Sequence, residues 1–327
     1  MMRTAPTLAV AVILATVMVP VQASPPDYPC FRADAAPVID GDAGDACWQA
    51  TPLATGFSVL GDGFTDAKQT AFRACWDSTA IYLLVVCEEP DAAALILNVR
   101  DGADVWLYDG VEIFLQPGAT GAVYQFAVAA SGARTSGAGT ADFRQLTAAS
   151  TIAGASYTLE VAIPHELVRA SPAEGDTWRG NVCRNIWTTT SGGDKFTCWA
   201  PLQRQFNEPE NFATFRLRGE APPAEVIAAL TRGLNSGYQQ YLLAEVKQLV
   251  MRAPVYLPVL KLARDNEELG GTARELLYQW YRLARAQDAS DRYTIRELRE
   301  MVQNAHGLLA ESYTVKYAYL IDELFPD

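Results

Sequence analysis

The sequence predicts a mainly β protein: an antiparallel β-sandwich, jelly-roll or immunoglobulin-like, followed by a smaller all-α helical bundle. Two observations lead to this prediction. Residues 30–218 hold many short apolar runs separated by Gly, Asp, Ser and Pro, which is the pattern of strands and turns. From residue 224 onward Leu, Ala, Glu and Arg dominate, and apolar residues recur at helical spacing.

Turn signals divide the β region into hairpins. Polar or glycine-rich stretches at residues 77–80, 117–121 and 191–194 each separate two predicted strands. We expect strands at residues 70–76, 81–87, 111–116, 123–129, 157–163, 180–187, 195–200 and 212–217. A tight first hairpin places Cys75 opposite Tyr82. Cys87 then lies on the other face of the sheet, which argues against a bond between Cys75 and Cys87.

The helical region follows two prolines at residues 222–223. Pro254 and the glycines at 270–271 interrupt its pattern, so we expect four or five helices, the last from about Thr294 towards Phe325. We therefore divide the chain into a β-sandwich at residues 24–220 and a helical domain at 221–327. Tyrosines at helical spacing favour packing within the bundle, and a surface for a protein partner is the alternative.

The first 23 residues have the pattern of a signal peptide. Arg3 precedes an apolar run at residues 8–19, and small residues precede a cleavage point after Ala23. We expect export to the periplasm or the extracellular space, with a retained anchor as the alternative. No later segment is apolar enough to predict a membrane span.

The cysteines and the net charge limit the kinds of metal, nucleic acid and membrane partner that the chain is expected to have. All six cysteines lie between Cys30 and Cys198, and an even number in an exported chain favours disulfides over metal thiolates. Cys183 and Cys198 lie near mirror positions about the third turn, which favours a disulfide between them. The net charge is −12, mostly from the β region, and this excess will repel nucleic acid and anionic membranes.

Residues 104–116, DVWLYDGVEIFLQ, are the most informative stretch. Asp109 and Gly110 predict a turn into a strand whose odd-numbered residues are apolar and face a core. Glu112 lies on the opposite face, beside Trp106 from the preceding loop. An aromatic plane next to a hydrogen-bonding acid is the chemistry of a sugar site.

Five motifs follow one another in the β region. They are IDGD with Trp48 (residues 39–48), the strand pair at 72–82, the central motif at 106–114, YTLEVAIP at 157–164 and NVCR at 181–184. In this order they resemble the family 9 carbohydrate-binding module and its relatives with a dopamine-hydroxylase-type sandwich. The resemblance covers about residues 37–218, and it implies this fold and non-catalytic sugar binding.

The resemblance also implies site residues. In sugar-binding members of the family, two tryptophans clamp a terminal sugar and polar side chains bond its hydroxyls. The first tryptophan matches Trp106, the acid matches Glu112, and the second tryptophan is best matched by Trp199. The family's arginine ligand on the next strand has no clear counterpart, and Gln125 is the candidate substitute.

Other polar and aromatic positions have competing interpretations. Asp109 is either an acid that orders the loop or a turn residue, and Arg184 and Asn185 are candidates for lining the same cleft. Trp106 and Trp199 have packing in the core as their alternative. The remaining tryptophans of the β region that we singled out are expected in the core: Trp48, Trp76 and Trp178.

The resemblance further implies a structural calcium ion, and Asp40, Asp42 and Asp45 are its candidate ligands. An acidic turn is the alternative. No other cofactor is expected. The β region has one histidine, His165, and no methionine, which argues against a haem site of the His/Met type.

The sequence thus predicts an exported, non-catalytic protein that binds a mono- or oligosaccharide or a polysaccharide end, in support of polysaccharide breakdown. A structural or assembly module on the same sandwich, without a sugar site, is the first alternative. A glycoside-acting enzyme with two opposed carboxylates is the second.

Overall fold

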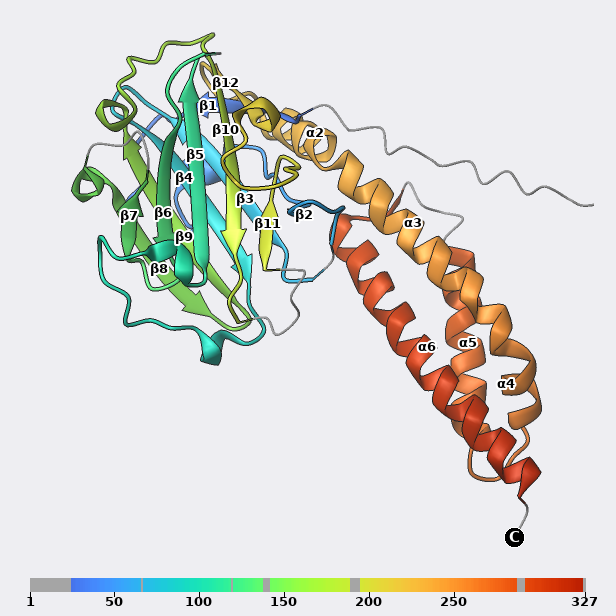
Figure 1. The fold of residues 1–327 in the computed structure, drawn as a ribbon. Coiled ribbons are helices and arrows are strands. Elements are labelled where there is room, and N and C mark those ends of the chain that lie inside the picture. The colour runs from blue at the N-terminus through green and yellow to red at the C-terminus, as the bar shows by residue number, and fades with distance from the viewer. Residues whose placement is uncertain are drawn as a thin grey trace, which may run out of the picture.

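The computed structural model describes residues 25–65, 67–118, 120–137, 142–188, 195–286 and 292–325. The predicted signal peptide at residues 1–23 lies outside this part of the chain. A β part precedes a helical part, and helices α3, α5 and α6 project away from the sheets (Figure 1).

The β part is one continuous ladder that folds over into two layers. Its strands lie in the order β7-β6-β5-β10-β12-β1-β3-β4-β9-β8, and the short strands β2 and β11 pair beside β10. Near the two ends of the ladder, Ser150 Oγ donates to the Ala130 carbonyl oxygen at 2.6 Å, so the sandwich is nearly closed. The strands are β1 Asp27–Arg32, β2 Ser58–Val59, β3 Thr70–Trp76, β4 Ala80–Glu88, β5 Gly110–Pro117, β6 Tyr124–Ala129, β7 Arg134–Ser136, β8 Thr147–Ala153, β9 Ser156–Pro164, β10 Thr177–Asn185, β11 Phe196–Cys198 and β12 Ala213–Arg218.

The prediction of a wholly antiparallel sandwich is wrong at one strand. Strand β1 runs parallel to both of its neighbours, β12 and β3. It lies where one layer continues into the other, and it pairs with strands distant in the chain, so no hairpin fixes its direction. The sandwich followed by helices is confirmed, whereas the jelly-roll or immunoglobulin-like connection stays a prediction.

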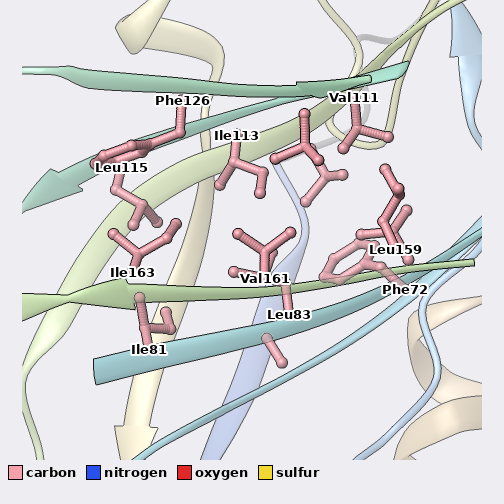
Figure 2. Close-up of a cluster of buried hydrophobic side chains, with 14 of the residues drawn as sticks. Phe72, Ile81, Leu83, Val111, Ile113, Leu115, Phe126, Leu159, Val161 and Ile163 are labelled. Carbon is pink, nitrogen blue, oxygen red and sulfur yellow. The ribbon is translucent and has the colours of Figure 1, made fainter. Parts of the chain in front are cut away.

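The main core fills the space between the layers. Val111, Ile113 and Leu115 on β5 face side chains of β4 and β9, among them Leu83 and Val161 (Figure 2). Each of these five is at most 1% exposed. The alternation predicted for residues 111–116 is therefore confirmed, and the face that carries Glu112 points away from the core.

The predicted first hairpin and core tryptophans are also confirmed. Cys75 pairs with Tyr82 across β3 and β4, and Cys87 lies in the main core while Cys75 packs in a cluster on the other face. Trp48, Trp76 and Trp178 are all buried.

The predicted disulfide is not formed in the structure. Cys183 and Cys198 are direct cross-strand partners on β10 and β11, as their mirror positions about the turn suggested. Both are buried thiols, like the other four cysteines. Burial raises the pKa of Cys183 and raises that of Cys198 to about 11, so both thiols are protonated at neutral pH in the folded protein.

The helical part begins at Ala224, six residues after the last strand ends. Thr294 caps its longest helix, because its hydroxyl accepts from the Glu297 amide while the Glu297 side chain accepts from the Thr294 amide. No helix of the described residues is long and apolar enough to cross a membrane. The helices are α1 Ala46–Gln49 in the β part, then α2 Ala224–Leu234, α3 Ser236–Arg252, α4 Leu257–Ala263, α5 Gly270–Ala286 and α6 Ile295–Leu324, with short 3₁₀ turns η1 Ala92–Ala94, η2 Val105–Leu107, η3 Phe143–Gln145, η4 His165–Val168, η5 Pro209–Asn211 and η6 Ala253–Val255.

Candidate functional site

The outer face of β6, β5 and β10 carries a group of polar side chains centred on Glu112. Its Oε1 accepts from Asn185 Nδ2 at 2.8 Å, and its Oε2 accepts from Gln125 Nε2 at 2.6 Å. Glu112 is only 5% exposed, so the acid lies deeper than the open strand face that the sequence suggested. Burial raises the pKa of Glu112, and the two amide donors partly oppose that rise.

The amides fix the Glu112 carboxylate without saturating it. An ionised carboxylate offers about four lone-pair positions, and the two amide bonds occupy one on each oxygen. The remaining positions suit hydroxyl donors. Asn185 and Gln125 also carry amide oxygens, which are acceptors. The group therefore offers hydrogen-bond acceptors to the hydroxyls of a polyhydroxyl ligand.

Trp106 lies beside this polar group. It belongs to the turn η2, is partly buried, and packs against a small cluster of alanines on the outer face of β6. One of them, Ala127, is the direct cross-strand partner of Glu112. Trp106 and Glu112 therefore occupy adjacent positions on one face, as the sequence predicted.

Trp187, two residues after Asn185, is the second aromatic of the site. It is 38% exposed, and its indole Nε1 donates to the Trp106 carbonyl oxygen at 3.1 Å. Asp109 Oδ1 accepts from the Trp187 amide at 2.9 Å and from the Thr188 amide at 3.2 Å. Asp109 thus holds this loop in place, which favours its interpretation as a loop-ordering acid.

Further aromatics extend this surface across β11. The ring of Phe196 meets that of Trp187 edge-on at 5.8 Å, and Phe206 continues the row at 5.9 Å. Lys195 Nζ lies 5.4 Å from the Trp187 ring centroid. Partly exposed aromatic rings that adjoin one another on a soluble domain indicate a ligand-binding surface.

The structure places Trp199 elsewhere, so its prediction as the second stacking residue is wrong. Cys198 and Cys183 share the outer face, and the next residue, Trp199, therefore points inward. It is 4% exposed and packs edge-on against Phe72 at 4.9 Å. The core alternative holds at this position.

Arg184 is also not in the site, because it points into the sandwich from the opposite face of β10. Its guanidinium is fully buried, lies 5.4 Å from the Tyr157 ring centroid, and pairs with Glu89 Oε2 at 3.3 Å. Nη1 donates to the Lys68 carbonyl oxygen, and Nη2, which also meets Glu89, donates to the Glu88 carbonyl oxygen, both at 2.7 Å. Arg184 joins the two layers at one end of the core and cannot reach a sugar.

The candidate calcium ligands are held in local turn contacts. Asp45 Oδ2 accepts from the Val38 amide at 2.9 Å, and Asp40 Oδ1 accepts from the Asp42 amide at 2.9 Å. Across the described residues, no three His, Cys, Asp or Glu side chains converge as a metal site would require. The geometry therefore favours the acidic-turn alternative, and a calcium requirement stays a prediction.

Sequence reasoning named Asn185 only as a residue that could line the cleft, and it missed Trp187. Strand alternation carried the signal for both. Once Cys183 is set opposite Glu112, the residues two and four positions further on lie on the same face, at 185 and 187. The same alternation assigns Arg184 and Trp199 to the core.

The fold and the site define a class: a β-sandwich module with a polar and aromatic outer face. Residues 39–220 match the family described as carbohydrate family 9 binding domain-like, and the chain belongs to this family. No curated protein sequence matches the chain.

Three solved structures are similar to the β part. A family 9 carbohydrate-binding module from Caldicellulosiruptor kristjanssonii, in complex with glucose, shares 20% identity over 60% of this chain and 98% of its own, with a TM-score of 0.48. The complex of such a module with cellotriose gives 20% identity, 59% and 94% coverage and a TM-score of 0.44. A proposed carbohydrate-binding protein from Bacteroides uniformis gives 19%, 60% and 99%, with a TM-score of 0.47.

Proposed function

We propose that this chain is an exported, non-catalytic carbohydrate-binding protein whose sugar site is the outer face of β6, β5 and β10. The observation that carries the proposal is the fixed group of Glu112 and Asn185 beside the half-exposed ring of Trp187. A sugar has apolar C–H faces and a rim of hydroxyls. It therefore needs an aromatic plane and directed hydrogen-bond partners side by side.

Each residue has a distinct part in this proposal. The rings of Trp187 and Trp106 contact the C–H face of a terminal sugar unit. Glu112 accepts from hydroxyls, the Asn185 amide oxygen completes the rim, and Gln125 orients the acid through its own hydrogen bond. Phe196 extends the apolar contact towards a second unit, which suits an oligosaccharide or a polysaccharide end.

Export and a supporting role in polysaccharide breakdown belong to the same proposal. The pattern of residues 1–23 supports export, and membership in a family of binding domains supports binding without catalysis. The two acids of the central motif do not favour hydrolysis, because Asp109 is occupied in ordering the loop at Trp187 and Thr188.

One observation favours a second candidate, a structural module without a sugar site. Both oxygens of Glu112 already accept from protein amides, and the acid is nearly buried. In this alternative the polar group only stabilises the sheet face, and the aromatics contact another protein.

Isothermal titration of the full chain with glucose and cellotriose separates the two. We expect saccharide binding that is lost in Trp187→Ala and retained in Tyr278→Ala. Tyr278 on α5 is a matched control, because it is 58% exposed and lies in the helical part. If no mono- or oligosaccharide binds at millimolar concentration, the structural module is the better description.

A further inference from the structure

A cavity of about 740 Å³ lies between the sandwich and the helices, away from the aromatic site. Leu53, Thr55 and Glu88 line it from the β part. The helical part contributes the end of α2, the start of α3 and the first two turns of α6 together with the residues before it. Its volume is in the range of sites that hold a small organic molecule.

Hydrogen bonds fix the walls of this cavity. Asn235 is 3% exposed, accepts from the Thr55 amide at 2.9 Å and donates to the Leu53 carbonyl oxygen at 2.9 Å. Gln239 Nε2 donates to the Tyr293 carbonyl oxygen at 3.0 Å, which ties α3 to the segment before α6. On the far side Arg299 pairs with Glu88 through both terminal nitrogens, one at 2.7 Å. The cavity is therefore a built space bounded by three sets of contacts.

The lining is basic in an acidic chain. Four arginines and two glutamates line the cavity, an excess of two positive charges, while the whole chain carries −12. Two of the arginines are paired, Arg299 with Glu88 and Arg296 with Glu300 at 3.0 Å. Arg232 and Arg292 form no ion pair with any described residue. Like charges in one cavity repel each other unless an anion lies between them.

We propose that this cavity binds a small organic oxyanion, a molecule of about disaccharide size with a carboxylate or phosphate group. Arg232 and Arg292 present guanidinium forks that match either group with two parallel hydrogen bonds. Leu53, Tyr293 and Ile295 offer apolar contact to the body of the ligand. The proposal is independent of the proposed sugar site.

The test is titration of the full chain, at constant ionic strength, with four probes. Digalacturonate carries carboxylates, glucose 6-phosphate carries a phosphate, cellobiose is the neutral organic probe, and inorganic phosphate is the bare anion. We expect one or both organic anions to bind, and the double variant Arg232→Gln/Arg292→Gln to weaken that binding at least tenfold. The variant Arg252→Gln, an exposed arginine of α3 outside the cavity, is expected to leave it unchanged.

Two further comparisons make the result decisive. Trp187→Ala is expected to leave anion binding unchanged, because that residue lies outside the cavity lining. Circular dichroism of the double variant is expected to match that of the parent, because both arginines are exposed. The proposal is overturned if the double variant binds the organic anions as well as the parent does. It is equally overturned if neither organic anion binds, or if inorganic phosphate binds as tightly as they do.

Discussion

Separate substitutions of two tryptophans, Trp187 and Trp199, test both the corrected site and the proposed function. Trp187→Ala removes a ring that is 38% exposed, and Trp199→Phe alters a ring that is 4% exposed and packed in the core. We expect the first change to lower sugar affinity with little effect on stability. The second is expected to lower stability and leave the affinity of the folded protein unchanged.

The exposed surface of Trp187 sets the size of the first effect. A tryptophan of about 250 Å² that is 38% exposed presents roughly 95 Å² to a ligand. At about 25 cal/mol per Å², covering half to all of this surface contributes about 1.2 to 2.4 kcal/mol. Such a loss weakens binding about 7- to 50-fold.

The effect of Trp199→Phe is expected in the measurement of stability and not in the measurement of sugar affinity. Replacing a buried large aromatic by alanine costs about 3 to 5 kcal/mol, and the phenylalanine variant, which keeps a ring against Phe72, is expected to cost less. Urea unfolding gives the stability, and isothermal titration of the folded fraction with cellotriose gives the affinity. If Trp199→Phe weakened binding as much as Trp187→Ala, with unfolding unchanged, our assignment of the two rings would be refuted.

Four other predictions concern the surroundings of the site. Burial raises the pKa of Glu112, so sugar affinity should fall as the pH is lowered through a value above the usual glutamate range of about 4.3, and titration of Glu112→Gln should show no such step. Because Cys183 and Cys198 are direct cross-strand partners, oxidative export should join them, which peptide mass mapping without reductant detects; closing this 15-residue loop should add about 3 kcal/mol of stability. Arg184→Ala should lower the free energy of unfolding by about 3 kcal/mol, measured in urea, because it removes one member of a buried ion pair. EDTA should leave the melting temperature unchanged within about 1 °C if the acidic-turn alternative holds, as the lack of three converging His, Cys, Asp or Glu side chains among the described residues favours, whereas a fall of several degrees would support the calcium prediction.

The local sequence pattern was sufficient to predict the fold wherever strands that are consecutive in the chain pair with one another. The first hairpin and its register followed from a turn signal and alternation, and the start of α6 at Ile295 lies where the helical periodicity placed it, at about Thr294. Strand β1 was not predictable in this way. Its partners lie far along the chain, at Thr214–Arg218 and Cys75–Trp76, and Pro29 weakens its strand pattern.

The sequence predicted the part of the site that lies within one continuous segment. Trp106 and Glu112 belong to a single motif, and their proximity follows from a turn that enters a strand. The second tryptophan depends on which face of β10 and β11 each residue occupies. That assignment needs the register between β5 and β10, which are separated by 59 residues, and sequence likeness alone does not supply it.

Arg184 shows why adjacency in the chain misled the prediction and what this residue does instead. It follows Cys183 and precedes Asn185, but alternation turns it into the core while both neighbours face the site. From there it pairs with Glu89, whose Oε2 also accepts from the Thr188 hydroxyl at 2.8 Å. The Thr188 amide donates to Asp109 Oδ1 at 3.2 Å, and Asp109 also accepts from the Trp187 amide, so the buried arginine and the exposed ring are two ends of one chain of polar contacts. A sugar face on a loop needs such an anchor, because an exposed tryptophan that moved freely would lose its conformational entropy on every binding event.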